Sequence, residues 1–131
     1  MEELTLDILL STIDTKNISK LRSLFDEYNK VDIAALLEQL PVNKSVFVFT
    51  TVPSSLTADV FAYLDEDYQQ KIIELLKEAD LKKILAELYS DDIADVVEQM
   101  PANVVRKVLK SIDKDTRKDI NKLFYTRKIF I

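Results

Sequence analysis

Apolar residues recur every twelve positions along this chain, and this period constrains the fold more than any other feature. Three columns carry it, each with one apolar residue in nearly every unit. The first column holds Leu40, Val52, Leu64, Leu76, Leu88, Met100, Ile112 and Phe124, the second runs from Leu36 to Ile120, and the third from Leu37 to Leu109. Such a period is typical of a solenoid, in which no unit can bury its apolar face alone. Because solenoids commonly present surfaces to partners, the repeat favours regulation or scaffolding over catalysis.

Each unit has the pattern of a short amphipathic helix. In the unit at 91–101, the residues Ile93, Val96, Val97 and Met100 fall at i, i+3, i+4 and i+7, which is one face of an α-helix. We therefore expect an all-α superhelical solenoid of about nine to ten short helices. Residues 19–125 form the repeats, and residues 1–18 are expected to form a capping helix and loop that lie off the period. The period also overrides the high β-propensity of residues 46–52.

A second column marks where each helix starts. It reads Ser19, Val31, Asn43, Ser55, Asp67, Ala79, Asp91, Asn103 and Asp115, and seven of these nine are N-cap types. We predict that this column caps the helices. All three prolines, Pro41, Pro53 and Pro101, fall just after the last apolar position of a unit, where proline stops a helix.

The composition excludes several classes of function. The 131 residues contain no glycine, cysteine or histidine, which removes glycine-rich phosphate loops, disulfides, Cys/His zinc sites and histidine-dependent catalysis. No apolar run approaches the roughly 20 residues that cross a bilayer. The net charge of −5 argues against nucleic-acid binding. We expect neither an enzyme nor a small-molecule substrate site.

Charge is distributed unevenly. Residues 84–105 contain no Lys or Arg, whereas the segment from Arg106 to Lys128 carries nine basic residues against three acidic ones. Solvated helix faces explain such blocks without any function. The alternatives are an acidic site for a cation or basic partner, and a basic end that faces a membrane or an acidic partner.

The units of the type D-I-A-x-[LV]-[LV]-E-Q-[LM]-P at 32–41 and 92–101, together with Ala58-Asp59-Val60-Phe61, resemble the intracellular N-terminal domain of MgtE-type magnesium transporters. The resemblance covers about residues 4–124 and implies a right-handed superhelix. It also implies a single domain over residues 1–131 that acts as the cytosolic Mg²⁺-sensing and gating part of a homodimeric transporter in the cell membrane. The expected partners are the CBS domains and the transmembrane domain of the full-length protein, neither of which lies in this chain.

The resemblance places the Mg²⁺ ligands of this domain at Asp59, Asp91 and Asp95. Asp91 and Asp95 are one helical turn apart, and Asp59 occupies the same unit position as Asp95 three units earlier. A superhelix with about three units per turn would bring Asp59 and Asp95 onto one face. Capping would equally explain Asp91, and solvent exposure would explain the other two. The alternative function is a protein-interaction scaffold, such as a flagellar motor switch module of the FliG type.

Overall fold

The computed structural model describes residues 2–126, and these residues form ten α-helices without a strand. The helices are α1 (Leu6–Asp14), α2 (Ile18–Glu27), α3 (Lys30–Leu37), α4 (Val42–Thr51), α5 (Ser54–Tyr63), α6 (Glu66–Leu75), α7 (Glu78–Ala86), α8 (Ser90–Val97), α9 (Ala102–Lys110) and α10 (Lys114–Thr126). The expected all-α class is confirmed, and the β-prone segment lies in α4.

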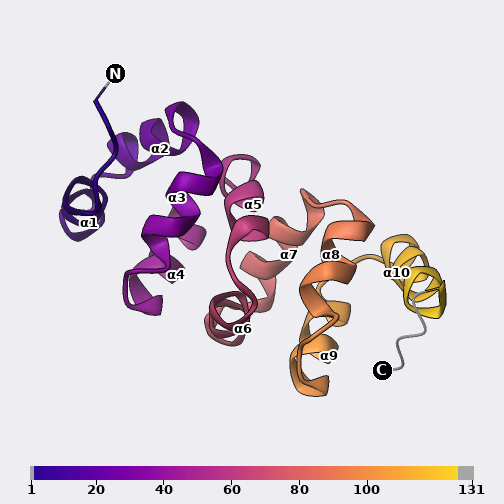
Figure 1. The fold of residues 1–131 in the computed structure, drawn as a ribbon. Coiled ribbons are helices and arrows are strands. Elements are labelled where there is room, and N and C mark those ends of the chain that lie inside the picture. The colour runs from indigo at the N-terminus through magenta and orange to yellow at the C-terminus, as the bar shows by residue number, and fades with distance from the viewer. Residues whose placement is uncertain (1, 127–131) are drawn as a thin grey trace.

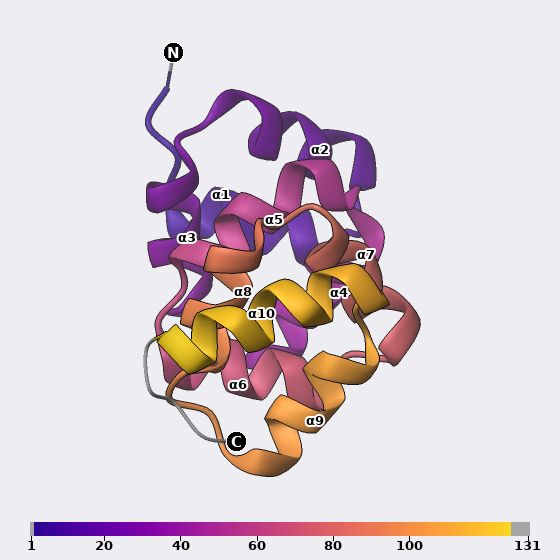
Figure 2. The ribbon, with the colours of Figure 1, turned by 90° about the vertical axis from the view of Figure 1, so that its right-hand side faces the viewer.

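Helices that are two or three positions apart in the chain pack on one another. Helix α3 packs on α5, α4 on α6, α5 on α7 and α8 on α10, whereas α2 packs on α5 and α6 on α9. The result is an elongated array with α1 at one end and α10 at the other (Figure 1). Seen along the array, α10 lies in front of the preceding helices (Figure 2). This stacking is compatible with the expected solenoid, and the superhelical path and its right-handed sense remain predictions.

The columns of twelve line one continuous hydrophobic core. Every residue of the three columns from position 36 to Leu109 is buried or packs partly buried against that core. A further column, three residues ahead of the second, is also fully buried from Leu9 to Val105, but its three central members are polar. Ser45, Thr57 and Gln69 occupy α4, α5 and α6, and each makes a hydrogen bond inside the fold. This column of the core is therefore apolar only towards its two ends.

The predicted capping column is two residues too late. The N-cap residues are Thr5, Asn17, Asn29, Pro41, Pro53, Asp65, Lys77, Tyr89 and Pro101. Asp91 therefore does not cap α8; it lies in the first turn after the N-cap Tyr89. The spacing of twelve was right, but only some of these caps use a side chain, so residue type alone could not locate the column.

The first helix keeps the period, contrary to expectation. Its N-cap Thr5 lies twelve residues before Asn17, and its buried Leu9 and Ile13 fall in the same columns as Leu21 and Phe25 of α2. Helix α1 is thus one more copy of the unit. The sequence pattern does not reveal this copy, because the polar Thr12 occupies a position of the second column that is otherwise apolar.

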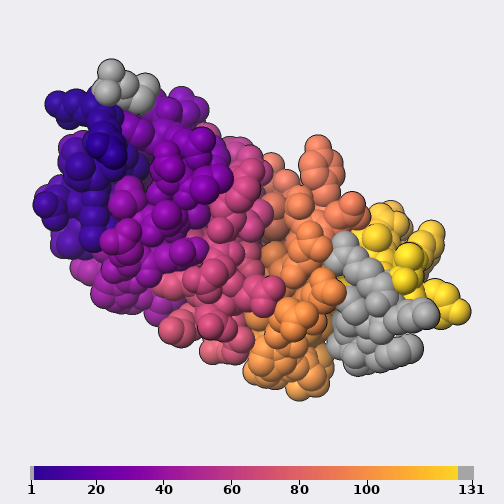
Figure 3. All heavy atoms as spheres, viewed as in Figure 1, coloured from indigo at the N-terminus to yellow at the C-terminus, as the bar shows by residue number. Residues whose placement is uncertain are grey.

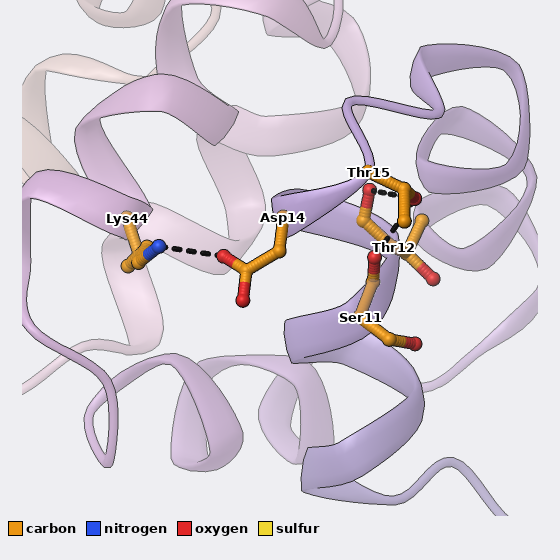
Figure 4. A network of polar contacts seen from close by, with 5 residues as sticks. All are labelled: Ser11, Thr12, Asp14, Thr15 and Lys44. Atoms are coloured by element: carbon orange, nitrogen blue, oxygen red, sulfur yellow. Dashed lines mark hydrogen bonds and ion pairs between the residues drawn. The ribbon is translucent and has the colours of Figure 1, made fainter.

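The end of α1 is fixed to α4 by the ion pair between Asp14 and Lys44, whose Oδ1 and Nζ atoms lie 2.5 Å apart (Figure 4). The same close view shows the Thr15 hydroxyl donating to the Ser11 carbonyl at 2.8 Å, which closes the helix end. Both charged side chains are partly exposed, so the pair adds little stability. It holds two helices that are 30 residues apart in a defined alignment.

Lys107 of α9 satisfies the carboxyl end of α6. Its ammonium nitrogen lies 2.5 Å from the Ile73 carbonyl oxygen, 2.6 Å from that of Leu76 and 3.2 Å from that of Glu74. The last carbonyls of a helix have no partner inside the helix and carry the negative end of its dipole. Lys107 therefore supplies both donors and charge, and it joins α9 to the end of α6.

We expect Tyr68→Phe to destabilise the fold by roughly 1–3 kcal/mol at neutral pH, because it removes a buried hydrogen-bonded hydroxyl. The Tyr68 hydroxyl donates to the Leu40 carbonyl at 3.0 Å, so Ser45, whose Oγ lies 2.7 Å from it, must donate to Tyr68. Urea unfolding at pH 8 measures the loss.

The same substitution should also change the alkaline limit of stability. Burial raises the pKa of Tyr68 above its usual value of 10.0. The hydrogen bond from Ser45 lowers the same pKa, but by less than burial raises it. A raised pKa in the folded state means that the stabilisation is complete below about pH 10 and is lost as the pH rises towards the folded value. The parent chain should thus lose more stability above pH 10 than the phenylalanine variant. Parallel pH curves for the two proteins would refute this role of Tyr68.

Candidate functional site

Helix α8 carries three aspartates, two of them in its first turn and one further along the helix. Asp91 and Asp92 lie in the first turn, where the helix dipole favours negative charge. The helix buries Ile93 and Val97 among its apolar positions, so Asp91 and Asp95 both lie on its exposed side. They are one turn apart, as the sequence predicts.

Asp59 lies on the exposed side of α5 because its neighbours Ala58 and Val60 are both buried. It follows the N-cap Pro53 by the same six positions that separate Asp95 from Tyr89. The repeat therefore gives Asp59 and Asp95 equivalent orientations within their units.

An open depression of roughly 200 Å³ lies where the end of α5 meets the start of α6 and the face of α8. It is lined by Ala62, Leu64, Glu66, Gln69, Asp92, Asp95 and Val96. Asp95 is thereby brought to the end of α5. Asp59 precedes Ala62 by three residues, so it is a neighbour of Ala62 on the α5 surface. Asp91 is outside the depression.

Two carboxylates of this depression were not predicted as site residues. Asp92 precedes Asp95 by three residues, a spacing that already puts both on one side of a helix. Glu66 lines the depression from the start of α6, and the sequence of a single unit contains no signal for its approach to α8. The floor is closed by the buried Gln69, whose amide nitrogen donates to the Phe61 carbonyl at 2.9 Å.

The chemistry of this face suits a hard cation, since its charged donors are carboxylates. Within residues 2–126, however, no group of three or more acidic side chains is assembled closely enough to enclose a metal ion. A cation at Asp59, Asp91 or Asp95 would therefore keep water ligands or take further oxygen atoms from another surface. Mg²⁺ commonly binds in this way, through one or two carboxylates and several waters.

The geometry defines a helical repeat domain with an acidic face. The sequence matches the family described as the MgtE intracellular N domain over residues 28–125. The chain belongs to this family, and this agrees with the resemblance seen in its units. This match favours the transporter interpretation over the flagellar one. No helix within the described part of the chain is both long and apolar enough to cross a bilayer.

Solved structures share the fold. The chain is similar to the soluble part of a magnesium transporter, with a TM-score of 0.78 and 18% identity over 90% of this chain and 47% of that one. It is also similar to the cytosolic domain of the Mg²⁺ channel MgtE in complex with ATP, with a TM-score of 0.72 and 26% identity over 89% of this chain and 48% of that one. The chain thus spans about half the length of these structures. No curated protein matches the sequence.

Proposed function

We propose that this chain is the cytosolic Mg²⁺-sensing domain of a magnesium transporter, and that Asp59, Asp91 and Asp95 are its share of the Mg²⁺ ligands. The observation that carries the proposal is the exposed acidic face of α5 and α8 in a member of the MgtE N-domain family. Its partners are then the CBS domains and the transmembrane domain of a homodimeric full-length protein. The domain works at the cytoplasmic face of the cell membrane.

An incomplete site explains how such a domain can report Mg²⁺ concentration. Two acidic surfaces repel each other when they face across a gap, and a divalent cation between them replaces repulsion with attraction. A ligand shifts an equilibrium only by its different affinity for the two states. Because this domain alone offers only part of a coordination shell, the bound state requires the neighbouring module, and Mg²⁺ stabilises the joined arrangement. The isolated chain is expected to bind Mg²⁺ weakly.

We expect charge-deleting substitutions to raise the Mg²⁺ concentration at which the full-length protein joins its domains. Asp59→Asn, Asp91→Asn and Asp95→Asn preserve side-chain size and remove one negative charge each. Each should shift the midpoint of Mg²⁺-dependent protection of the domain junction from protease by roughly fivefold to tenfold, since the loss of one metal–carboxylate contact is worth about 1 kcal/mol or more. Limited proteolysis of the full-length transporter across a Mg²⁺ titration measures this midpoint.

The matched control is Asp26→Asn, which removes the same charge from an exposed position on α2, far from α8 in the array. Asp92 is not a suitable control because it lines the depression beside Asp95. Circular dichroism should be unchanged in all four variants. If the three variants protect the junction at the same Mg²⁺ concentration as Asp26→Asn does, the acidic face does not sense the ion.

A further inference from the structure

The outer face of α10 carries a row of basic residues. The residues at i, i+4 and i+8 from its start are Lys114, Lys118 and Lys122, all exposed, and Arg117 and Asn121 lie between them. Tyr125 extends the same face by one further turn and is 84% exposed. At a rise of about 1.5 Å per residue the row from Lys114 to Tyr125 is roughly 16 Å long.

The basic side chains have no structural role that accounts for them as a group. The opposite face of α10 supplies the packing through the buried Ile120 and Phe124, and α10 packs on α8. Among the residues that the structure describes, Arg117 alone of this group makes a hydrogen bond, in which its guanidinium donates to the Leu109 carbonyl at 2.5 Å. Within residues 2–126 none of the three lysines pairs with a carboxylate. The acidic residues of the helix, Asp115 and Asp119, are also exposed, and they border the lysine row three residues before Lys118 and Lys122.

The charge of the whole molecule is polarised towards this end. Residues 1–101 contain 20 acidic and 9 basic residues, a net charge of −11, whereas residues 102–131 contain 3 acidic and 9 basic residues, a net charge of +6. Two of those nine, Arg127 and Lys128, lie outside the described residues. Helix α10 forms one extremity of the array (Figures 1 and 3). Because the Debye length is about 8 Å at physiological salt, the acidic helices at the other extremity are screened from a surface that α10 touches.

We propose that the outer face of α10 binds the anionic lipid headgroups of a membrane. Lysines are flexible point charges that suit a planar, diffuse layer of negative charge, whereas recognition of a fixed carboxylate favours the bidentate geometry of arginine. A row of exposed lysines on one helix is the pattern that attracts such a layer, and an exposed tyrosine at its end suits the headgroup region. The apolar face of α10 is committed to the core, so the helix lies on the bilayer without entering it.

The inference rests on the proposed function for its biological setting, because a domain tethered to a membrane protein is held close to the bilayer. A tether makes a weak contact effective by raising the local concentration of the two surfaces. The consequence is an orientation: the basic end faces the membrane and the acidic face of α5 and α8 remains available to the neighbouring module.

The experiment is cosedimentation of the 131-residue chain, without Mg²⁺, with vesicles of equimolar phosphatidylserine and phosphatidylcholine at low ionic strength. We expect binding to these vesicles, none to pure phosphatidylcholine, and loss of binding as salt is added. The triple variant Lys114→Gln, Lys118→Gln, Lys122→Gln should reduce the partition coefficient by about 100-fold, since each lysine near an anionic surface contributes a factor of roughly five. The matched triple variant Lys71→Gln, Lys77→Gln, Lys83→Gln changes the net charge equally and should retain most of the binding.

Three results would overturn the proposal. The first is failure of the parent chain to bind phosphatidylserine vesicles at low ionic strength. The second is an equal loss in the two triple variants, which would show an effect of net charge alone. The third is tighter binding to soluble poly-glutamate than to the vesicles, which would identify an acidic protein as the partner. The Mg²⁺-sensing proposal is tested separately, because no metal is present here and Asp59, Asp91 and Asp95 are unchanged.

Discussion

Phe61→Ala should destabilise the domain by about 3–5 kcal/mol, the usual cost of removing a fully buried phenylalanine. Phe61 is 0% exposed and packs edge-on against Phe49, with ring centroids 5.9 Å apart and an interplanar angle of 87°. It belongs to α5, which packs on α2, α3 and α7. The units of a solenoid are stabilised by their neighbours, so a cavity at this central helix weakens the coupling between the two halves of the array. Urea unfolding followed by circular dichroism measures the loss.

Tyr63→Ala is the control for this substitution. Tyr63 is an aromatic residue of the same helix but is 58% exposed, so its truncation should change stability by no more than about 0.5 kcal/mol. The Phe61 variant should unfold at much lower urea, and its transition should broaden if the two halves separate. Equal midpoints for the two variants would show that the core does not pass through α5 as described.

Lys107→Met should cost about 2 kcal/mol, because hydrogen bonds to a charged group contribute roughly 1.5–3 kcal/mol and the freed carbonyls have no partner inside α6. Methionine retains the length and apolar stem of lysine, so the packing between α6 and α9 is preserved while the ammonium group is lost. The free energy of unfolding in urea gives the effect.

Lys110→Met provides the comparison, since Lys110 is an exposed base in the last turn of the same helix. Its loss should cost only the few tenths of a kcal/mol typical of a surface charge near a helix end. Should Lys107→Met and Lys110→Met destabilise equally, the three carbonyl contacts contribute nothing specific.

The period explains why so much of the fold is predictable from the sequence. Leu36, Val48 and the residues that follow them at steps of twelve are all buried or partly buried, as their spacing predicts. The period also overrides local propensity correctly at residues 46–51, which are helical despite their β-branched and aromatic composition. The type and number of the helices follow from this regularity, because each unit buries apolar residues at the same positions.

Contacts between units were less predictable, because the pattern inside one unit carries no information about them. Glu38 accepts a hydrogen bond from the Asp65 backbone nitrogen at 2.8 Å, across 27 residues. The buried Ser45 and Gln69 are satisfied by partners in other helices, which only the stacked structure defines, whereas Thr57 donates to the Pro53 carbonyl one turn earlier. For the candidate site, the exposure of Asp59, Asp91 and Asp95 follows from helical periodicity, whereas the juxtaposition of Asp95 with Glu66 depends on how α6 meets α8.

Seven of the joints between helices share one backbone geometry. Seven N-cap residues, from Asn29 to Pro101 at steps of twelve, have φ between −54° and −74° and ψ between 133° and 159°. Every amino acid can adopt this region, and proline is preset for it. The joints therefore require a particular backbone conformation but no particular side chain. For this reason asparagine, proline, lysine and tyrosine all occur at these positions. Substitutions that keep this backbone region open are therefore expected at the joints without a change in the direction of the helices.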